Sequence, residues 1–418
     1  MSTLLIEGGQ ALAGRVEVEG NKNSALPLLA ACLLTDQECV LHNVPRIGDV
    51  EVMARLLLDL GAEVDGIGTT TLRVRCPEVR KDEPDPALVG RLRGSVLLLG
   101  PLLVRRGRAR LALPGGDFPA RRTLDTHVAA LAGMGARVLE SRGHALDADD
   151  GLRGVSMYLD EASVTGTETA LLAAAGAAGV TELRHAATEP HVSELCRFLR
   201  AMGVDLTGEG TSTIRIEGSP RRGGATHTLW GDYIDAGTWA VVAAVTRGSV
   251  EVAGARATDV EPGVSVLRRL GVHCTLDDTG LLVEPGTLRA AGRITTGLWP
   301  GFPSDFVSLV TVLATQADGR TLVHDWMYEL RLFALDQLAG MRADLFLCDP
   351  HRIIVTGPSR LRGRALDSRD LRSGMALIAA ALAAEGESRV TPLETVERGY
   401  SRLVERLHSL GARVTKLH

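Results

Sequence analysis

The chain has 418 residues, 45% of them hydrophobic, and a formal net charge of −5. Its length exceeds what one ordinary hydrophobic core supports and predicts two domains, while the negative balance argues against a nucleic-acid partner or an anionic membrane surface. Only 3% of the residues are aromatic, so Ala, Leu, Val and Gly must fill the interior, which favours helices packed closely against sheets.

Six segments rich in Ala, Leu and Val recur along the chain. They occupy residues 25–34, 95–104, 168–178, 237–246, 306–315 and 373–384. Since none of them has a polar face, they predict buried helices. Each is followed by a turn and a short strand pattern, as in 39–44 and Ser249–Ala253.

A second motif alternates with the first: an amphipathic helix, a glycine that can cap its carboxyl end, and an alternating strand. The cap positions recur about every 70 residues and are Gly61, Gly135, Gly203, Gly271, Arg342 and Gly411. Together the two motifs describe one β-α-β-α-β-β unit, and six such units fill the chain. Three units in each domain give two similar lobes; a solenoid of six repeats is the alternative.

The segment 113–127 combines a backbone break with charged side chains. A Pro-Gly-Gly run ends the preceding strand pattern, and Asp117 follows, with Arg121 and Arg122 close behind. A carboxylate beside guanidinium groups on such a loop suits a mobile lid over an anionic substrate. A surface turn with a solvated ion pair is the alternative interpretation.

Charged and polar residues also stand at the starts of the six buried helices. They are Lys22 and Asn23, Arg93, the run 163–167, the run 232–235, Asp305 and Arg372. A helix N-terminus offers free N–H groups and about half a positive charge, so several such ends together would form an anion site. Ser163, Asp232 and Asp305 could instead be ordinary N-caps.

The cations at these helix starts do not fit the N-cap interpretation. Lys22, Arg93 and Arg372 oppose the helix dipole, so we expect a bound anion to compensate them. Three of the 46 lysine and arginine residues are lysines, so arginine is the default cation of this chain. Lys22 therefore indicates a site that requires a compact ammonium group. No P-loop and no dinucleotide-binding glycine motif supports nucleotide hydrolysis or NAD chemistry.

The six cysteines contain no Cys-x-x-Cys pair, and several lie in apolar runs; they are Cys32, Cys39, Cys76, Cys196, Cys274 and Cys348. This pattern predicts reduced thiols, with neither disulfides nor zinc. The first ten residues lack a basic region and contain Glu7, so they do not predict a signal peptide. No apolar run approaches the roughly 20 residues of a membrane span. We expect a cytoplasmic protein without a metal site.

Taken together, several motifs resemble those of the enolpyruvyl transferases. They are 21–27 (Asn-Lys-Asn-Ser-Ala-Leu-Pro), 113–117 (Leu-Pro-Gly-Gly-Asp), 163–167 (Ser-Val-Thr-Gly-Thr), Glu189-Pro190, 302–305 (Phe-Pro-Ser-Asp), 370–372 (Asp-Leu-Arg) and 397–400 (Glu-Arg-Gly-Tyr). The more similar branch is UDP-N-acetylglucosamine 1-carboxyvinyltransferase, and the match extends over essentially the whole chain. The resemblance implies an inside-out α/β barrel whose two lobes, 22–231 and 1–21 plus 232–418, close on substrate.

The resemblance also implies a reaction: the enolpyruvyl group of phosphoenolpyruvate moves to a hydroxyl of a uridine nucleotide by addition and elimination of phosphate, without a cofactor. The implied phosphoenolpyruvate residues are Lys22, Arg93, Arg122, Arg331, Arg372 and Arg398. The implied nucleotide contacts are Asn23, Arg122, Asp125, Glu161, Ser163, Val164, Thr165, Asp305 and Met327.

The implied catalytic residues are Lys22, Asp117, Asp305 and Arg398. A dense anion explains the set of cations. Protonation at C3 while a hydroxyl attacks C2 requires an acid and a base in separate environments. By resemblance Asp305 takes the proton of the acceptor hydroxyl, and Asp117 stands where most members of the family have Cys. From the residues alone, the assignment of acid and base stays open.

Departures from the family pattern concern the acceptor. Glu161 replaces a Lys that lies near the diphosphate of the sugar nucleotide, and an anion there opposes a diphosphate by Coulomb repulsion. Other departures are 118–121, Thr123, Trp326, Met327 and Leu330. They favour UMP as acceptor, as in the enolpyruvyl transferases of nucleoside-antibiotic biosynthesis.

Two alternatives remain open. One is a UDP-N-acetylglucosamine 1-carboxyvinyltransferase of peptidoglycan synthesis that has drifted at these positions. The other, of a different class, is a pseudoenzyme that only binds a uridine nucleotide; the presence of Lys22, Asp117 and Asp305 argues against it. The oligomeric state does not follow from the sequence.

Overall fold

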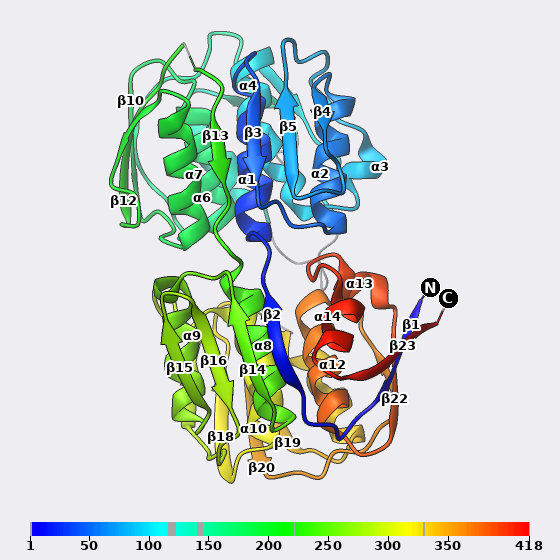
Figure 1. Ribbon diagram of the computed structural model, residues 1–418. Coiled ribbons are helices and arrows are strands. Elements are labelled where there is room, and N and C mark those ends of the chain that lie inside the picture. Colours follow the sequence, from blue (N-terminus) through cyan, green and yellow to red (C-terminus); the bar gives the residue numbers. More distant parts are fainter. Residues whose placement is uncertain (1, 116–122, 140–144, 221, 329–330, 418) are drawn as a thin grey trace. The chain divides into compact units, whose positions relative to one another are not determined.

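The computed structural model describes residues 2–115, 123–139, 145–220, 222–328 and 331–417, with the side chains of Phe333 and Ala334 left out. The chain divides into two compact units (Figure 1). Residues 20–230 form one, here the first lobe, and residues 1–19 with 231–418 form the other, here the second lobe. The predicted boundaries lie one or two residues from these division points.

The first lobe holds three sheets. The first sheet, in spatial order, is β13 (Thr226–Thr228), β3 (Cys39–His42), β5 (Thr71–Arg75) and β4 (Glu63–Asp65). The second is β6 (Arg108–Arg110), β8 (Ala145–Asp147) and β7 (Arg137–Val138). The third is β11 (Asp205–Thr207), β12 (Thr213–Glu217), β10 (Val180–Arg184) and β9 (Ser156–Tyr158).

The second lobe repeats the plan. Its first sheet is β15 (His273–Asp277), β16 (Gly280–Glu284), β14 (Ser249–Ala253) and β2 (Ala13–Glu17). Its second is β17 (Gly292–Thr295), β18 (Gly319–His324), β20 (Arg352–Gly357) and β19 (Asp344–Asp349). Its third is β21 (Ala365–Asp367), β22 (Glu387–Thr391), β1 (Thr3–Glu7) and β23 (Arg413–Leu417).

Each four-stranded sheet joins one parallel pair to two antiparallel strands, as in β9, β10, β12 and β11. This is the predicted β-α-β-α-β-β unit. Three strands, however, pair with strands that are distant in the sequence. β13 pairs with β3, β2 pairs with β14, and β1 lies between β22 and β23. Residues 1–19 therefore belong to the second lobe through backbone hydrogen bonds.

The six predicted buried helices are confirmed. They are α1 (Lys22–Cys32), η1 with α4 (Arg93–Leu98, Leu99–Arg106), α6 (Val164–Ala174), α8 (Tyr233–Val245), η2 with α10 (Ser304–Phe306, Val307–Thr315) and α12 (Leu371–Ala383). Two of them open with a 3₁₀ turn that the sequence did not predict. In the first of these, Pro101 has no N–H for the carbonyl of Leu97, which favours the tighter turn before it.

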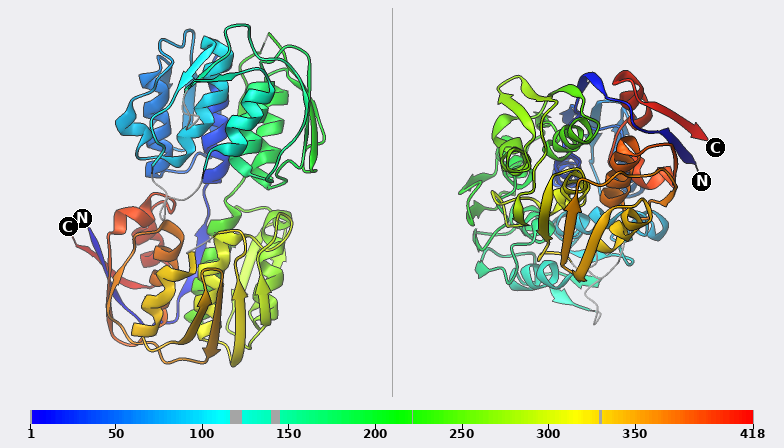
Figure 2. Two further views of the ribbon diagram at one scale, coloured as in Figure 1. Left: turned by 180° about the vertical axis from the view of Figure 1, so that it is seen from behind. Right: turned by 90° about the horizontal axis from the view of Figure 1, so that it is seen from below.

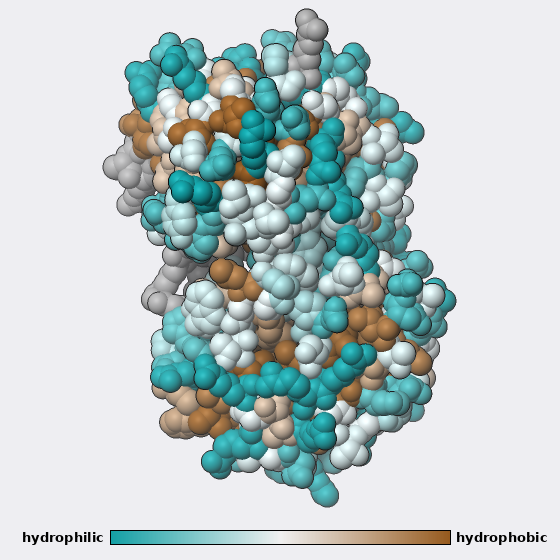
Figure 3. Space-filling model, turned by 90° about the vertical axis from the view of Figure 1, so that its left-hand side faces the viewer, coloured by the Kyte–Doolittle hydropathy of each residue, from teal (hydrophilic) through white to brown (hydrophobic). Residues whose placement is uncertain are grey.

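These helices lie inside their lobes and the sheets outside. All 13 residues of α8 are buried, and β14 and β16 pass in front of this helix (Figure 1). From behind, β18 and β20 cover α10 in the same way (Figure 2). Each lobe has its own hydrophobic core. On the face drawn in Figure 3, apolar side chains gather only in separate patches among hydrophilic ones.

The remaining helices alternate with the buried ones. They are α2 (Gly48–Asp59), α3 (Pro86–Val89), α5 (Asp125–Gly133), α7 (Pro190–Ala201), α9 (Ala257–Arg269), η3 (Arg331–Asp336), α11 (Gln337–Gly340), α13 (Leu393–Glu397) and α14 (Leu403–Ser409). All six predicted cap positions have positive φ, including Arg342 at 71°. Among the described residues, no helix is both long enough and apolar enough to cross a membrane.

Candidate functional site

The second lobe brings together a carboxylate and two guanidinium groups from η2, η3 and α12. Asp305 lies in η2, and its Oδ1 is 3.3 Å from Arg331 Nη2 and 3.6 Å from Arg372 Nε. We call these three residues the Asp305 cluster. The arginine side chains are 11% and 8% exposed, against 28% for Asp305. The fold thus brings together three of the predicted site residues.

Asp305 is not a helix cap, which was the alternative interpretation of its position. The N-cap residue of η2 is Pro303, and no side chain caps this turn. Ser163 and Asp232, by contrast, accept hydrogen bonds from the first N–H groups of α6 and α8. The carboxylate of Asp305 is therefore directed to the two guanidinium groups.

Arg372 is held from several sides. Its Nη1 donates to the hydroxyl of Tyr400 over 3.2 Å, and that hydroxyl is 3.1 Å from Oγ1 of Thr238. Burial by itself lowers the pKa of the Arg372 guanidinium, but the charges of Asp305, Tyr400 and Asp232 outweigh it and raise the pKa above its ordinary value. The guanidinium stays a buried cation, which needs anions around it.

Arg331 is fixed by a second chain of hydrogen bonds. Its Nη1 donates to Ser304 Oγ over 2.6 Å, and Ser304 Oγ donates to Asp325 Oδ2 over 2.7 Å. Asp325 is fully buried and also accepts from Thr296 Oγ1 over 3.0 Å. The Arg331 guanidinium lies over the ring of Tyr328, 4.5 Å from its centroid. Little rotamer freedom is left to Arg331.

Two further predicted residues of this lobe lie near these contacts in the sequence. Arg398 is the C-cap of α13 and partly buried, two residues before Tyr400. Met327 is partly buried, and its N–H donates to Asp325 over 3.3 Å.

In the first lobe, Lys22 is the first residue of α1. Its Nζ donates to Asp49 Oδ2 over 3.1 Å, and the two side chains are 13% and 5% exposed. Asn21 caps the helix by accepting the N–H of Asn23 over 2.8 Å. The capped start of α1 thus presents an ammonium group whose buried partner is a single aspartate side chain.

Arg93 begins η1, and its Nη2 donates to the carbonyl of Thr123 over 3.0 Å. Close by, the buried His127 meets Thr165 Oγ1 through Nε2 over 2.8 Å. Burial, and then the charge of Arg93, lower the pKa of His127 to about 4. Since Thr165 lies in the first turn of α6, the starts of η1, α5 and α6 meet in one place.

The other predicted residues of this lobe are less enclosed. Asp125 and Glu161 are exposed, while Asn23 and Val164 are partly buried. Glu161 stands two residues before the α6 N-cap in the sequence. The predicted residues Asp117, Arg121, Arg122 and Leu330 lie outside the described residues.

The chain matches the family model described as EPSP synthase (3-phosphoshikimate 1-carboxyvinyltransferase) over residues 6–407. It belongs to this family of enolpyruvyl transferases. The predicted family and enzyme class are confirmed: the protein is an enolpyruvyl transferase, and phosphoenolpyruvate is its enolpyruvyl donor.

Relatives along the whole chain support the assignment. The UDP-N-acetylglucosamine 1-carboxyvinyltransferase of Bradyrhizobium diazoefficiens is 42% identical over 421 residues, with 99% of this chain and 97% of the relative covered. The Treponema denticola protein of the same name is 40% identical, with 99% of each covered.

Solved structures show the same fold. The enolpyruvyl transferase NikO from Streptomyces tendae superposes with a TM-score of 0.89 at 25% identity, over 99% of this chain and 98% of NikO. EPSP synthase from Acinetobacter baumannii reaches a TM-score of 0.76 at 18% identity over all of both chains, which speaks for the fold alone. The transferase thus has the two-lobed inside-out barrel that the sequence predicted.

Sequence reasoning missed three polar residues that support the predicted ones. Asp49 and Asp325 are buried carboxylates that hold Lys22 and the Ser304–Arg331 pair, and His127 ends the segment 113–127. Asp325 follows a strand pattern and precedes Trp326, a weak signal that many loops share. The contacts of these residues depend on partners that are distant in the sequence.

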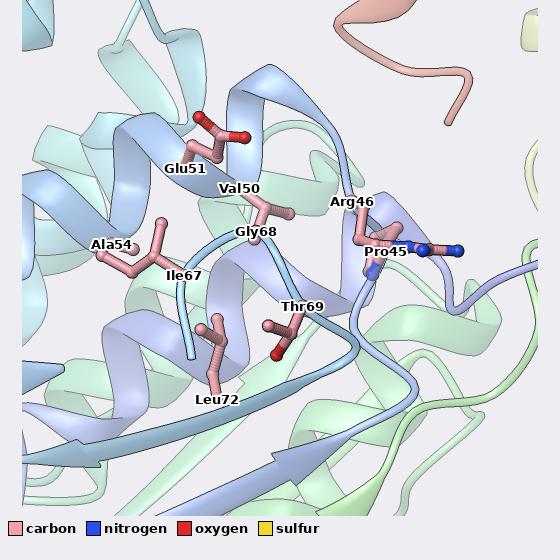
Figure 4. Close-up of a pocket in the computed structure, with 9 residues that line it drawn as sticks. All are labelled: Pro45, Arg46, Val50, Glu51, Ala54, Ile67, Gly68, Thr69 and Leu72. Atoms are coloured by element: carbon pink, nitrogen blue, oxygen red, sulfur yellow. The ribbon is translucent and has the colours of Figure 1, made fainter. Parts of the chain in front are cut away.

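A small pocket elsewhere in the first lobe does not belong to this site. It lies between α2 and the turn at Gly68, where Val50, Ile67 and Leu72 gather (Figure 4). The empty space there, which includes open solvent, is about 210 Å³. No predicted site residue lines this pocket, so nothing links it to the candidate site.

Proposed function

We propose that this enolpyruvyl transferase uses UMP as its acceptor. The observation that carries the proposal is Glu161, an exposed carboxylate two residues before the N-cap of α6. A sugar nucleotide with a diphosphate brings two negative phosphates to its binding site, and a carboxylate in place of a cation repels them. A nucleoside monophosphate brings a single phosphate group to the binding site.

The alternative acceptor is UDP-N-acetylglucosamine. The names of the relatives that are 42% and 40% identical favour it. At about 4 Å and an effective dielectric constant near 20, one charge pair is worth roughly 4 kcal/mol before screening. Even a quarter of that changes affinity several-fold, and a monophosphate has a single phosphate to keep away from Glu161.

The cations have a common role in the proposed reaction. Lys22, Arg93, Arg331, Arg372 and Arg398, together with Arg122, hold the carboxylate and phosphate of phosphoenolpyruvate. Support comes from the burial of the arginines in the Asp305 cluster, since buried cations gain most from a bound dense anion.

Asp305 accepts the proton of the acceptor hydroxyl in this proposal. The hydroxyl oxygen adds to C2 while C3 receives a proton from an acid, for which Asp117 is the candidate. Loss of inorganic phosphate from C2 and of a proton from C3 then restores the double bond. The two arginines orient Asp305 and do not leave the carboxylate to rotate freely.

The remaining assignments concern the nucleotide. Asn23, Asp125 and the run Ser163, Val164 and Thr165 contact it, with Met327 from the second lobe. Ser163 is the N-cap of α6 and Thr165 lies in its first turn, so both place hydroxyl groups at the start of this helix, where they can bind polar groups of a nucleotide.

A competition experiment tests the acceptor. UMP and UDP-N-acetylglucosamine at equal concentration are mixed with phosphoenolpyruvate and the enzyme, and the products are separated by mass. We expect the UMP product to dominate and Glu161→Lys to shift preference toward the diphosphate sugar. Glu78→Lys, at an exposed position of the first lobe, makes the same charge change and should leave the preference unaltered.

Two results would contradict the proposal. A preference of about tenfold or more for UDP-N-acetylglucosamine, a gap of roughly 1.4 kcal/mol, would assign the enzyme to that acceptor. Binding of both nucleotides without any release of phosphate would favour the pseudoenzyme.

A further inference from the structure

A buried carboxylate in α7 is bonded to the start of α1. Glu194 is fully buried, and its Oε2 accepts the hydroxyl hydrogen bond of Ser24. Its Oε1 accepts the N–H of Trp230 over 2.8 Å and lies 2.9 Å from Nε2 of His227. Helices α7 and α1 pack against each other. None of these four residues has a role in the proposed reaction.

Two of these contacts connect Glu194 to the start of α1, one through Ser24 and one through Trp230. Ser24 lies in the first turn of the helix, two residues after Lys22. Trp230 acts through the backbone, because its carbonyl accepts the N–H of Asn21, the N-cap of α1, over 2.8 Å. Lys22 and Asn23 therefore lie between two points that Glu194 holds.

A buried carboxylate at this position is less favourable than an apolar side chain unless its hydrogen bonds have a purpose. Burial of a charge costs free energy unless hydrogen bonds compensate it, and a hydrophobic side chain of similar volume often packs as well or better. Leu199, one turn further along α7, fills its place with an apolar side chain. Unlike an apolar side chain, Glu194 makes directional hydrogen bonds, and its two carboxylate oxygens fix the position of the start of α1.

We propose that Glu194 is a positioning residue for phosphoenolpyruvate binding. By holding Ser24 and Trp230 it fixes the first turn of α1, and so directs the Lys22 ammonium, with its partner Asp49, toward the substrate. This inference rests on the role proposed for Lys22. It adds Ser24, His227 and Trp230 to the residues on which substrate affinity depends, although none of them touches the substrate.

The test is a double-mutant cycle on the dissociation constant of phosphoenolpyruvate, measured by calorimetry without an acceptor nucleotide so that no turnover occurs. We expect Ser24→Ala to weaken binding by about threefold to tenfold, the value of one hydrogen bond, and Glu194→Ala by more. In a Lys22→Ala background neither change should weaken binding further, because the group being positioned is gone.

Two variants separate positioning from stability. Glu194→Gln retains an oxygen for Trp230 and offers an amide N–H to Ser24 Oγ, so it should restore most of the affinity lost in Glu194→Ala. Leu199→Ala removes a buried side chain from the same helix; it should lower the melting temperature and leave the affinity unchanged.

The outcomes are distinguishable. If Lys22→Ala weakens binding measurably but Ser24→Ala and Glu194→Ala bind as the parent does, the positioning role is wrong and the proposed function stands. Additive losses in the Lys22→Ala background would also overturn it, since Glu194 would then affect binding independently of Lys22. If Lys22→Ala itself binds phosphoenolpyruvate normally, the proposed role of Lys22 fails first.

Discussion

Asp305 is the residue on which the proposed chemistry depends most. We expect Asp305→Asn to lower turnover by about 10²–10⁴-fold, the usual effect of removing a general base, and to spare nucleotide binding. Single-turnover rates and calorimetry measure the two effects. Asp349→Asn is a matched control, because Asp349, at the end of β19, also pairs with an arginine, and this partner, Arg352, is 53% exposed. Near-parental turnover of Asp305→Asn would remove Asp305 from the mechanism.

His127 makes the stability of the first lobe depend on pH. Its folded pKa of about 4 lies below the ordinary 6.5, because burial and Arg93 disfavour the charged ring. The unfolded chain therefore binds more protons between these values, so this contribution is full above pH 6.5 and is lost as the pH falls through 4. Its size is at most about 3 kcal/mol.

Urea unfolding at pH 7 and pH 5 checks this prediction. His127→Gln should flatten the pH dependence, whereas His273→Gln, at a side chain that is 67% exposed, should leave it unchanged. An equal pH dependence in the parent and in His127→Gln would show that other groups are responsible.

At the scale of the element, one of the six helix caps carries a residue other than glycine. Arg342 occupies a cap position with φ of 71°, where a side chain with Cβ is strained and its five counterparts are glycines. Arg342 is exposed, so its side chain has little packing to lose. We expect Arg342→Gly to stabilise the protein by about 0.5–1 kcal/mol, measured by urea unfolding.

The reverse change is the control. Gly203 has φ of 90°, and a Cβ there would meet no atom within 4 Å. Gly203→Ala therefore isolates the backbone strain and should destabilise by about 1–2 kcal/mol. If both substitutions leave stability unchanged, the positive φ values do not carry the expected backbone strain.

At the scale of the whole molecule, the first lobe is one continuous segment of the chain, whereas the second lobe is made of two segments. Every strand of the first lobe, including β13, lies within 20–230. The second lobe needs residues 1–19, because β1 joins β22 to β23 and β2 pairs with β14. We expect 20–230 to fold alone and 231–418 not to fold, as judged by near-ultraviolet circular dichroism and cooperative thermal unfolding.

A circular permutant supplies the control. Thr3 and Leu417 are paired, and the two chain ends lie close together (Figure 1). A short flexible linker from Leu417 to Thr3 gives the order 231–418 then 1–19, which should fold as the second lobe. A cooperatively folded 231–418 fragment without β1 would contradict this account of the sheets.

The sequence by itself determined what depends on neighbours along the chain. Apolar segments without a polar face predicted the buried helices, since burial follows from composition and period. The glycines at cap positions predicted helix ends, because the positive φ is a local requirement. Lys22, Asp305 and the arginines were predicted as site residues from motifs that resemble those of the enolpyruvyl transferases, and their roles stay a prediction.

Only the tertiary structure decided which distant groups meet. β1, β2 and β13 are ordinary short strand patterns, and nothing local says that each completes a sheet at the other end of a lobe. The sequence could not separate Asp305 from a helix cap, because the choice depends on Arg331 and Arg372. The partners of buried polar groups depend on packing in three dimensions, which hydrophobic periodicity and composition do not predict.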